Sequence, residues 1–253
     1  MTKGTRIALV TGASSGIGRA SALALAKDGF QVIITARRKT ELLETVDLAD
    51  NLAANILPVT GDVSNPDSVE QLFNLIMEKY GRLDLLFNNA GVTIPSTPTT
   101  EIPIEKWKYV MDVNVMGSFL CAQQALKIML KQNPKGGRII NNGSVAAQVP
   151  RAQGLAYSMS KHAISGLTKS LCLDYREDSI CCCQIDLGNA KVPRTSAVGK
   201  TGRIQSNGKV QTEHQIDVNI VAETIVHIAN LPLSTNVPFM TMMALGMPFI
   251  GRG

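Results

Sequence analysis

Tyr157 and Lys161 stand four positions apart and are the pair in this chain best suited to acid–base chemistry. On a helix, side chains with this spacing share one face, so the ammonium lies one turn from the phenol. Free tyrosine has a pKa of about 10, and a phenol that donates at neutral pH needs its anion stabilised by about 4 kcal/mol. A neighbouring ammonium supplies part of that stabilisation. Tyr157 is therefore a candidate to exchange a proton with a reacting oxygen.

Ser144 stands thirteen residues before Tyr157 and follows an apolar, strand-like run. Its hydroxyl could hold a substrate oxygen while negative charge develops there. Beside a hydride carrier, these groups suit hydride transfer to or from a carbonyl carbon, with Tyr157 moving the proton. A single Tyr-x-x-x-Lys match also arises by chance, so the hypothesis depends on a dinucleotide site elsewhere in the chain.

Such a site is indicated by the stretch Thr11-Gly12-Ala13-Ser14-Ser15-Gly16-Ile17-Gly18, which follows an apolar run and opens an alanine-rich helical pattern. Glycines let backbone N–H groups approach phosphates, and the helix N-terminus adds partial positive charge. The spacing T-G-x-x-x-G-x-G has a wider first gap than the G-x-G-x-x-G fingerprint. A glycine-rich turn can also merely reverse the chain, but its place between a strand and a helix favours a phosphate site.

The end of the second expected strand bears on which dinucleotide is bound. An acidic residue about twenty positions after the glycine loop would accept bonds from the ribose hydroxyls of NAD. This sequence has Thr35-Ala36-Arg37-Arg38 instead, with no carboxylate there to repel a 2′-phosphate. A charge-assisted bond to that phosphate contributes about 1.5–3 kcal/mol. NADP is therefore expected over NAD; the alternative is that the two arginines are simply exposed at the start of a helix.

Two further stretches follow later strands and are ambiguous alone. In Gly61-Asp62-Val63, the Asp62 carboxylate could accept from an adenine amino group or cap the helix after Pro66. In Asn88-Asn89-Ala90-Gly91, small residues would let the backbone pack against a flat ligand, but an ordinary tight turn has the same composition.

Apolar strand-like runs alternate with helical patterns along the whole chain. Strands are expected at 6–11, 31–35, 55–59, 83–88, 138–142, 179–185 and 238–242, and helices at 17–28, 39–53, 66–80, 104–131, 154–177 and 216–229. Alternation of this kind implies parallel strands joined by right-handed crossovers, hence an α/β doubly wound sheet. Ligands bind such sheets at the carboxyl ends of the strands, where the motifs above fall. We expect residues 1–253 to form one domain.

The composition sets limits on the class of protein. The chain has 253 residues, 45% apolar and 18% charged, which fits a globular protein with a sizeable core. No apolar run reaches the length of a membrane span, and glycines interrupt the apolar stretch near the N-terminus, so neither a membrane nor a secretion signal is expected. The net charge is +5, but the basic residues are scattered and aromatic residues make up only 4%, so no nucleic acid is expected as a partner.

Five cysteines occur at positions 121, 172, 181, 182 and 183. None forms a C-x-x-C pair, so neither a metal site nor a redox dithiol is expected. The triplet suits a core strand, where neighbouring thiols point to opposite faces. An odd number of cysteines favours the reducing cytoplasm as the location of the protein.

In this combination the chain resembles the short-chain dehydrogenase/reductase family. The resemblance rests on 11–18, Asp62, 88–91, Asn114 in Met111-Asp112-Val113-Asn114-Val115, Ser144, and Tyr157 with Lys161, in the family's order and intervals over about residues 6–188. It implies a single Rossmann-like domain with a seven-stranded parallel sheet. It also implies a homotetramer or homodimer, pairing through the helices at 104–131 and 154–177.

By the same resemblance, Tyr157 would be the catalytic acid/base and Ser144 would orient and polarise the carbonyl. Lys161 would favour the phenolate and bind the nicotinamide ribose, and Asn114 would hold the water of a proton relay. Arg37 matches the position where NADP-preferring members carry a basic residue. The residues expected to bind NADP(H) are Gly12, Ser14, Ser15, Gly16, Ile17, Gly18, Arg37, Arg38, Asp62, Val63, Asn89, Ala90, Gly91, Tyr157, Lys161 and Gly188.

One loop departs from the family. Members usually carry Pro-Gly after the sixth strand and, four residues past that glycine, a threonine that touches the nicotinamide carboxamide. Here the sequence is Leu187-Gly188-Asn189-Ala190-Lys191-Val192, and Thr195 is a possible substitute. Residues 186–210 are expected to form a mobile lid over substrate. The leading hypothesis is an NADP-dependent carbonyl reductase or alcohol dehydrogenase acting on a small molecule; the altered loop keeps open a non-catalytic NADP-binding sensor or scaffold.

Overall fold

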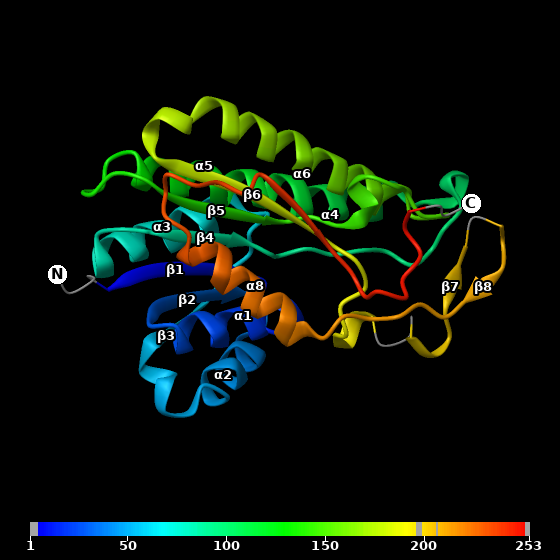
Figure 1. Cartoon of the computed structure of the whole chain (residues 1–253), viewed down its shortest axis with the longest axis horizontal. Helices are drawn as coiled ribbons and strands as arrows, with labels where there is room; N and C mark the ends of the chain where they lie inside the picture. The colour runs from blue at the N-terminus through cyan, green and yellow to red at the C-terminus, as the bar shows by residue number, and fades with distance from the viewer. Residues whose placement is uncertain (1–4, 196–198, 206, 251–253) are drawn as a thin grey trace.

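Seven parallel strands form the central sheet of the computed structural model, which describes residues 5–195, 199–205 and 207–250 (Figure 1). The strand order is β3-β2-β1-β4-β5-β6-β9, with every neighbouring pair parallel. The strands are β1 (Arg6–Thr11), β2 (Phe30–Ala36), β3 (Ile56–Thr60), β4 (Leu85–Asn88), β5 (Gly137–Asn142), β6 (Ile180–Leu187) and β9 (Phe239–Met242). The expected doubly wound α/β fold and the number of strands are confirmed.

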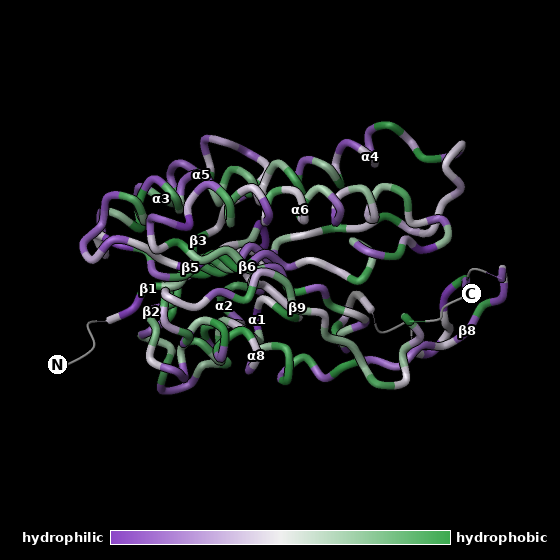
Figure 2. The backbone as a smooth tube through the Cα atoms, turned by 45° about the horizontal axis from the view of Figure 1, so that its top comes forward, coloured by the Kyte–Doolittle hydropathy of each residue, from purple (hydrophilic) through white to green (hydrophobic). Residues whose placement is uncertain are grey.

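Helices cover both faces of this sheet (Figure 1). One face carries α1 (Gly16–Lys27), α2 (Lys39–Asp47) and α8 (Val218–Asn230); the other carries α3 (Pro66–Tyr80), α5 (Gly117–Met129) and α6 (Leu155–Asp174). Because side chains alternate along a strand, Ala8 and Val10 of β1 enter the first core while Ile7 and Leu9 enter the second. Burial on both faces explains the continuous apolar strands of the sequence, which Figure 2 shows as hydrophobic segments between amphipathic helices.

Two expected helices are shorter than the sequence pattern indicated. The helix expected at 39–53 ends as α2 at Asp47, and a 3-10 helix, Asp50–Asn55, follows. Asp50, just after the end of α2, has a φ of 52°, which is left-handed and cannot continue an α-helix. The helix expected at 104–131 is divided into α4 (Ile104–Met111), a π-helical turn (Asp112–Met116) and α5. Hydrophobic periodicity predicted that the segment is helical, but it did not predict the position of the π-helical turn.

The segment after β6 contains structure that the sequence pattern did not indicate. Residues Arg203–Ile204 (β7) and Val210–Gln211 (β8) pair antiparallel as a hairpin, at one end of the molecule in Figure 1. A 3-10 turn, Pro193–Thr195, lies nearer the sheet. Within the expected lid at 186–210, residues 196–198 and 206 lie outside the described part of the chain. The lid remains a prediction.

The cysteine triplet lies on a buried strand, as expected. Cys181, Cys182 and Cys183 belong to β6, and all three are buried. Cys182 packs in one core and Cys183 in the other, so successive thiols do point to opposite faces. The described helices include none that is both long and apolar enough to cross a bilayer.

Candidate active site

The glycine loop between β1 and α1 has a backbone that larger residues could not adopt. Gly12 has φ +66°, and a Cβ there would lie 2.8 Å from the Cα of Ala90. A Cβ on Gly18 would lie 2.4 Å from the carbonyl oxygen of Gly12. Gly12 therefore allows the left-handed turn, and Gly18 lets α1 pack directly on the loop. The loop thus has the form of a cradle at a helix N-terminus, which suits a phosphate group.

A cleft of about 630 Å³ opens beside this loop, at the carboxyl ends of the central strands. The strand order reverses between β1 and β4, and ligands of doubly wound sheets bind at such a switch point. Twelve of the residues expected to bind the cofactor line the cleft: Gly12, Ser14, Ser15, Gly16, Ile17, Arg37, Arg38, Asp62, Val63, Asn89, Ala90 and Gly91. Gly18 lies beneath the loop rather than in the cleft lining.

Asn89 fixes the loop to the end of β4. Its Nδ2 donates to the carbonyl oxygens of Thr11 at 2.9 Å and Gly12 at 3.2 Å. In return, the Thr11 hydroxyl accepts from the backbone N–H groups of Asn89 and Ala90, each at 3.0 Å. These bonds join two strand ends across the switch point. The stretch 88–91 therefore has a structural function as well as lining the cleft.

The arginines expected to recognise a 2′-phosphate line the cleft but already have partners. Arg37 donates to the Tyr109 hydroxyl at 2.7 Å. Arg38 pairs with Glu41 at 2.7 Å and donates to the Ser14 hydroxyl at 3.1 Å. The expectation that no carboxylate is present holds for positions 35–38, but Glu41 and Glu44 of α2 also line the cleft.

Those two glutamates are each paired with a cation. Glu44 pairs with Arg19 at 3.0 Å, as Glu41 does with Arg38. Asp62 lines the cleft as well, so three guanidiniums, those of Arg19, Arg37 and Arg38, and three carboxylates face it. The lining charges therefore balance, but Arg37 has no carboxylate partner among the described residues, which suits an anionic group at the end of β2.

Asp62 lines the cleft but does not cap the following helix. Its Oδ1 accepts from the backbone N–H and the hydroxyl of Ser64, at 2.9 and 2.7 Å. Asn65 is the N-cap of α3, because its side chain accepts from the Ser68 N–H at 3.1 Å. Of the two functions considered for Asp62, helix capping is therefore wrong.

Tyr157 and Lys161 share one face of α6. The Lys161 Nζ lies 5.5 Å from the centre of the Tyr157 ring and donates to the carbonyl oxygen of Asn142 at 2.6 Å. The lysine is buried, and the hydrogen bond to the end of β5 fixes its ammonium beside the phenol. An ammonium at this distance stabilises negative charge on the phenol oxygen.

Ser144 follows β5 and is held by a buried carboxylate. Its backbone N–H donates to Asp186 Oδ1 at 3.0 Å, and its hydroxyl oxygen accepts from the Ala146 N–H at 3.1 Å. Asp186 also accepts from Gln184 at 2.7 Å and from Gln148 at 2.7 Å. Since the Ser144 hydroxyl accepts from Ala146, its hydrogen can point toward a substrate.

Asn114 lies in the π-helical turn with 1% of its surface exposed. Its Oδ1 accepts from the Val92 N–H at 2.7 Å, and its Nδ2 donates to the Val92 carbonyl at 2.9 Å and to the Ser160 hydroxyl at 2.9 Å. π-Helical turns inside α-helices are frequent at functional sites. The side chain thus links the segment after β4 to α6, which carries Tyr157.

A second, smaller cavity of about 80 Å³ brings Ser144 and Tyr157 together. Ile17 and Val192 line both this cavity and the larger cleft, so the two hollows adjoin. Gly188 and Thr195 also line the cavity, whereas Lys161 lies behind Tyr157 and lines neither hollow. The arrangement can hold a small molecule between the hydroxyls of Ser144 and Tyr157, next to a ligand in the cleft.

The loop that departs from the family pattern is ordered by its own bonds. Gly188 donates its N–H to the carbonyl of Met242 at 2.8 Å. The Thr195 hydroxyl donates to the Ala190 carbonyl and accepts from the Val192 N–H at 3.2 Å. Val192 packs against Gly16, since a Cβ on that glycine would lie 3.2 Å from Val192 Cγ1. Thr195 is therefore close to the cavity but shares its hydroxyl with the loop.

Three site residues were not predicted from the sequence. Asp186 and Glu213 have no local pattern that marks them, because their partners Ser144 and Arg151 are distant in the chain. Arg203 reaches the cavity from the hairpin, which local spacing does not indicate. Arg151 and Gln148 also belong to the site: Arg151 lines the cavity and Gln148 contacts Asp186.

Comparisons with known proteins agree with this geometry. Residues 6–203 match the family described as short chain dehydrogenase. A 3beta-hydroxysteroid dehydrogenase of Mediterraneibacter gnavus is 39% identical over 209 residues, which are 81% of this chain and 75% of that protein. The acetoin dehydrogenase YohF from Salmonella typhimurium is 30% identical in its crystal structure, with a TM-score of 0.83 over 98% of this chain and 97% of that one. The closed form of a serine dehydrogenase complexed with NADP+ is 27% identical, with a TM-score of 0.84 over 97% of each chain.

Proposed function

The chain belongs to the short-chain dehydrogenase family and is an oxidoreductase that transfers hydride between a nicotinamide cofactor and a carbonyl or alcohol. From this premise we propose that it is an NADPH-dependent reductase of small ketones or aldehydes. One observation supports the proposal most: Ser144 and Tyr157 line a single cavity that adjoins the cleft beside the glycine loop.

The residues of the cleft fit a dinucleotide cofactor. The glycine loop leaves no room for side chains where a pyrophosphate would approach, and the cleft volume of about 630 Å³ lies in the range of cofactor sites. The loop would hold the phosphates, and Asp62 and Val63 would lie beside the adenine. When bound, the nicotinamide supplies hydride for reduction or accepts it for oxidation.

Residues of this chain transfer the proton and stabilise the negative charge that develops on the substrate oxygen. In the reduction, hydride is added to the carbonyl carbon, and the resulting alkoxide takes the phenolic proton of Tyr157. The Ser144 hydroxyl donates a hydrogen bond to the same oxygen as its charge grows. The Lys161 ammonium stabilises the phenolate left behind, and a proton from solvent restores Tyr157. We assign the proton relay to the region of Asn114, which joins the segment after β4 to α6.

The preference for NADP over NAD is supported by Arg37, a cleft-lining arginine that has no carboxylate partner among the described residues. Arg37 and Arg38 lie at the end of β2, and binding of a 2′-phosphate would compete with the bonds from Arg37 to Tyr109 and from Arg38 to Glu41. The similar serine dehydrogenase was solved with NADP+. Because cells keep NADP largely reduced, reduction is the direction we propose.

Two further proposals concern the setting of the enzyme. We propose a homo-oligomer that pairs through α4, α5 and α6, where Met116, Phe119 and Met159 leave apolar surface exposed. A cytoplasmic location stays a prediction, supported by the free cysteines among the described residues.

The direct test is a screen of aldehydes and ketones with NADPH, followed by the loss of reduced cofactor. The proposal predicts that at least one small carbonyl compound is reduced. If NADPH binds but no compound in a broad panel oxidises it, the protein is instead a non-catalytic dinucleotide-binding sensor or scaffold.

A further inference from the structure

We propose that the cavity beside Tyr157 selects substrates that carry a carboxylate, and that Arg203 binds this group while Ser144 and Tyr157 hold the reacting oxygen. The inference rests on the proposed function and deepens it, because it names the substrate class as short-chain oxo acids or hydroxy acids. Nothing in the family resemblance assigns a role to Arg203.

The charge of the cavity lining is the first observation. Two arginines, Arg151 and Arg203, line the cavity, and none of the described lining residues is an aspartate or glutamate. A cavity with cationic side chains and no carboxylate attracts an anion. The reacting hydroxyls of Ser144 and Tyr157 lie in the same cavity, so an anion there would belong to the substrate.

Arg151 is the less available of the two cations. Its Nη1 lies 3.0 Å from Glu213 Oε2, and the two side chains are 14% and 1% exposed. Its Nη2 donates to Asn189 Oδ1 at 3.2 Å. Because the carboxylate of Glu213 is buried against Arg151, this pair contributes little net charge to the cavity.

Arg203 is the second arginine of the cavity lining. No carboxylate of the described residues lies within ion-pair distance of its guanidinium. The residue is half-buried on β7, so its charge is only partly solvated. A guanidinium in this setting gains most from a carboxylate, which it can bind through two parallel hydrogen bonds.

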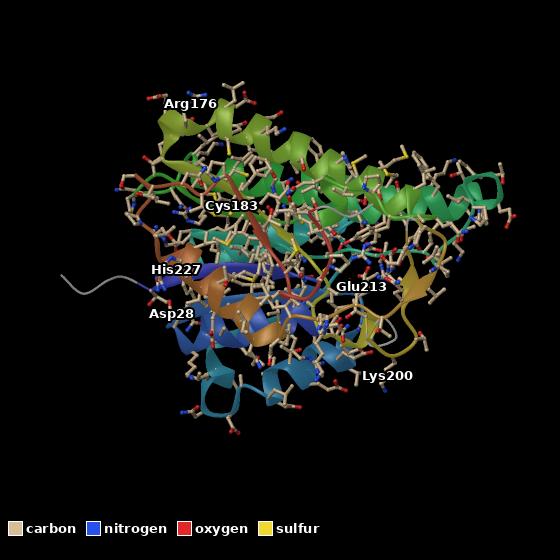
Figure 3. All side chains as sticks on the ribbon, turned by 45° about the vertical axis from the view of Figure 1, so that its right-hand side comes forward. Asp28, Arg176, Cys183, Lys200, Glu213 and His227 are labelled. Atoms are coloured by element: carbon tan, nitrogen blue, oxygen red, sulfur yellow. The ribbon has the colours of Figure 1, made fainter. Side chains whose placement is uncertain are left out.

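A buried polar network positions Arg203 at the cavity. The Gln205 Nε2 donates to the Arg203 carbonyl at 3.2 Å and to Glu213 Oε1 at 3.0 Å. Glu213 also accepts from Asn189 at 2.6 Å, and Asn189 lies two residues after the end of β6. Glu213 lies two residues after the end of β8, and Figure 3 shows it beside the orange part of the ribbon. The hairpin is thus tied to the sheet at the point where Arg203 meets the cavity.

The cofactor is not the anion that Arg203 binds. The arginines of the large cleft are Arg19, Arg37 and Arg38, and Arg203 is absent from its lining. The cavity of about 80 Å³ is small. At about 10–15 Å³ for each water-sized group, it holds about five to eight of them, which matches a short oxo acid.

The first experiment measures binding, so it does not depend on turnover. Butanoate and its neutral isostere butyramide are titrated by calorimetry into the full-length protein saturated with NADP+ and, in parallel, with NAD+. We expect the wild type to bind butanoate at least about tenfold more tightly than butyramide. Arg203→Gln should remove this difference and Arg203→Lys should keep part of it.

The matched control is Arg176→Gln. Arg176 is an arginine outside both hollows, far from Glu213 in Figure 3, so this change should leave the preference intact. Equal affinity of the wild type for the two ligands would overturn the inference, as would a preference that survives in Arg203→Gln. If the variant is misfolded, the wild-type comparison and Arg203→Lys still decide the matter.

A second experiment compares reduction of acetoacetate with reduction of its methyl ester by NADPH. We expect Arg203→Gln to raise the KM for the acid by about tenfold or more while the KM for the ester changes little. Reduction of neutral ketones without preference for the acid would overturn the inference and leave the proposed function standing. Failure to oxidise NADPH with any carbonyl compound would overturn the proposed function, while the calorimetry would still test the carboxylate site.

Discussion

Asp186 Oδ1 accepts the backbone N–H of Ser144 at 3.0 Å, and this bond joins the end of β6 to the residue that follows β5. Asp186 is 2% exposed. Gln184 and Gln148 donate to its carboxylate as well, and these bonds restrict its orientation. The bond therefore fixes the place of the Ser144 hydroxyl relative to Tyr157.

The first prediction concerns this bond. Asp186→Ala leaves the buried Ser144 N–H without an acceptor, and we expect kcat to fall about 10- to 100-fold, the effect of a small displacement of a reacting group. The KM for NADPH should change little, since Asp186 does not line the large cleft. Asp186→Asn keeps one oxygen and should recover most of kcat. Two outcomes would show that the carboxylate only stabilises the fold. Both variants would lower kcat equally, or the loss of kcat would be accounted for by a lower melting temperature of the variant.

The second prediction concerns the choice of dinucleotide. Arg37→Ala removes a guanidinium from the cleft, and we expect the affinity for NADPH to fall about 10- to 100-fold while that for NADH changes little. Fluorescence titration of each cofactor measures both constants. Arg176→Ala serves as the control for loss of one positive charge. An equal loss for the two cofactors would contradict the assignment of Arg37 to the 2′-phosphate.

The third prediction concerns the cysteines. A hydrogen bond from the Cys182 thiol, helped by the Asn236 amide, lowers the pKa of Cys172 to about 7. Burial raises the pKa of Cys121 to about 12 and that of Cys183 to about 12. Since the thiolate is the nucleophile, alkylation of Cys172 should be fastest, rising as the pH increases through about 7 and levelling off above it.

Iodoacetamide labelling followed by peptide mass spectrometry measures this profile. Cys172→Ser should abolish the fast phase. A midpoint near the ordinary value of a thiol, about 8.5, or faster labelling of another cysteine, would show that the hydrogen bonds do not act as described.

The fourth prediction concerns assembly. Phe119 is 44% exposed on α5, and a charge there would be buried if this helix pairs with a second copy. We expect Phe119→Asp to lower the mass measured by light scattering after gel filtration. Leu48→Asp, which alters a side chain 60% exposed next to α2, should leave the mass unchanged. A wild-type monomer would contradict the proposed pairing.

Most of the fold followed from local patterns. All seven strands lie within two residues of the expected limits. The inner strands are buried on both faces and give continuous apolar runs between turn residues, whereas the edge strands β3 and β9 are partly exposed. The π-helical turn at Asn114 and the β7–β8 hairpin were not predicted. Both make contacts with distant segments: Asn114 bonds Val92, and Glu213, which follows the hairpin, bonds Asn189 beyond the end of β6.

Site residues could be predicted where their spacing in the sequence determines their distance in the fold. Lys161 lies beside Tyr157 because four residues make one helical turn. By contrast, Asp186 reaches Ser144 across two strands and Arg203 reaches the cavity from the hairpin, so no local spacing could indicate either. Glu41 was not predicted to line the cleft, because it lies on α2 rather than at the end of β2.

The central claim is that Tyr157 donates the proton in a reduction by NADPH. It is tested most directly by Tyr157→Phe, which removes one oxygen and keeps the ring. With the best carbonyl compound from the screen, we expect kcat to fall by about 100- to 10,000-fold while the affinity for NADPH stays within about twofold of wild type. Turnover equal to that of the wild type would contradict the account, because the proton would then come from another group.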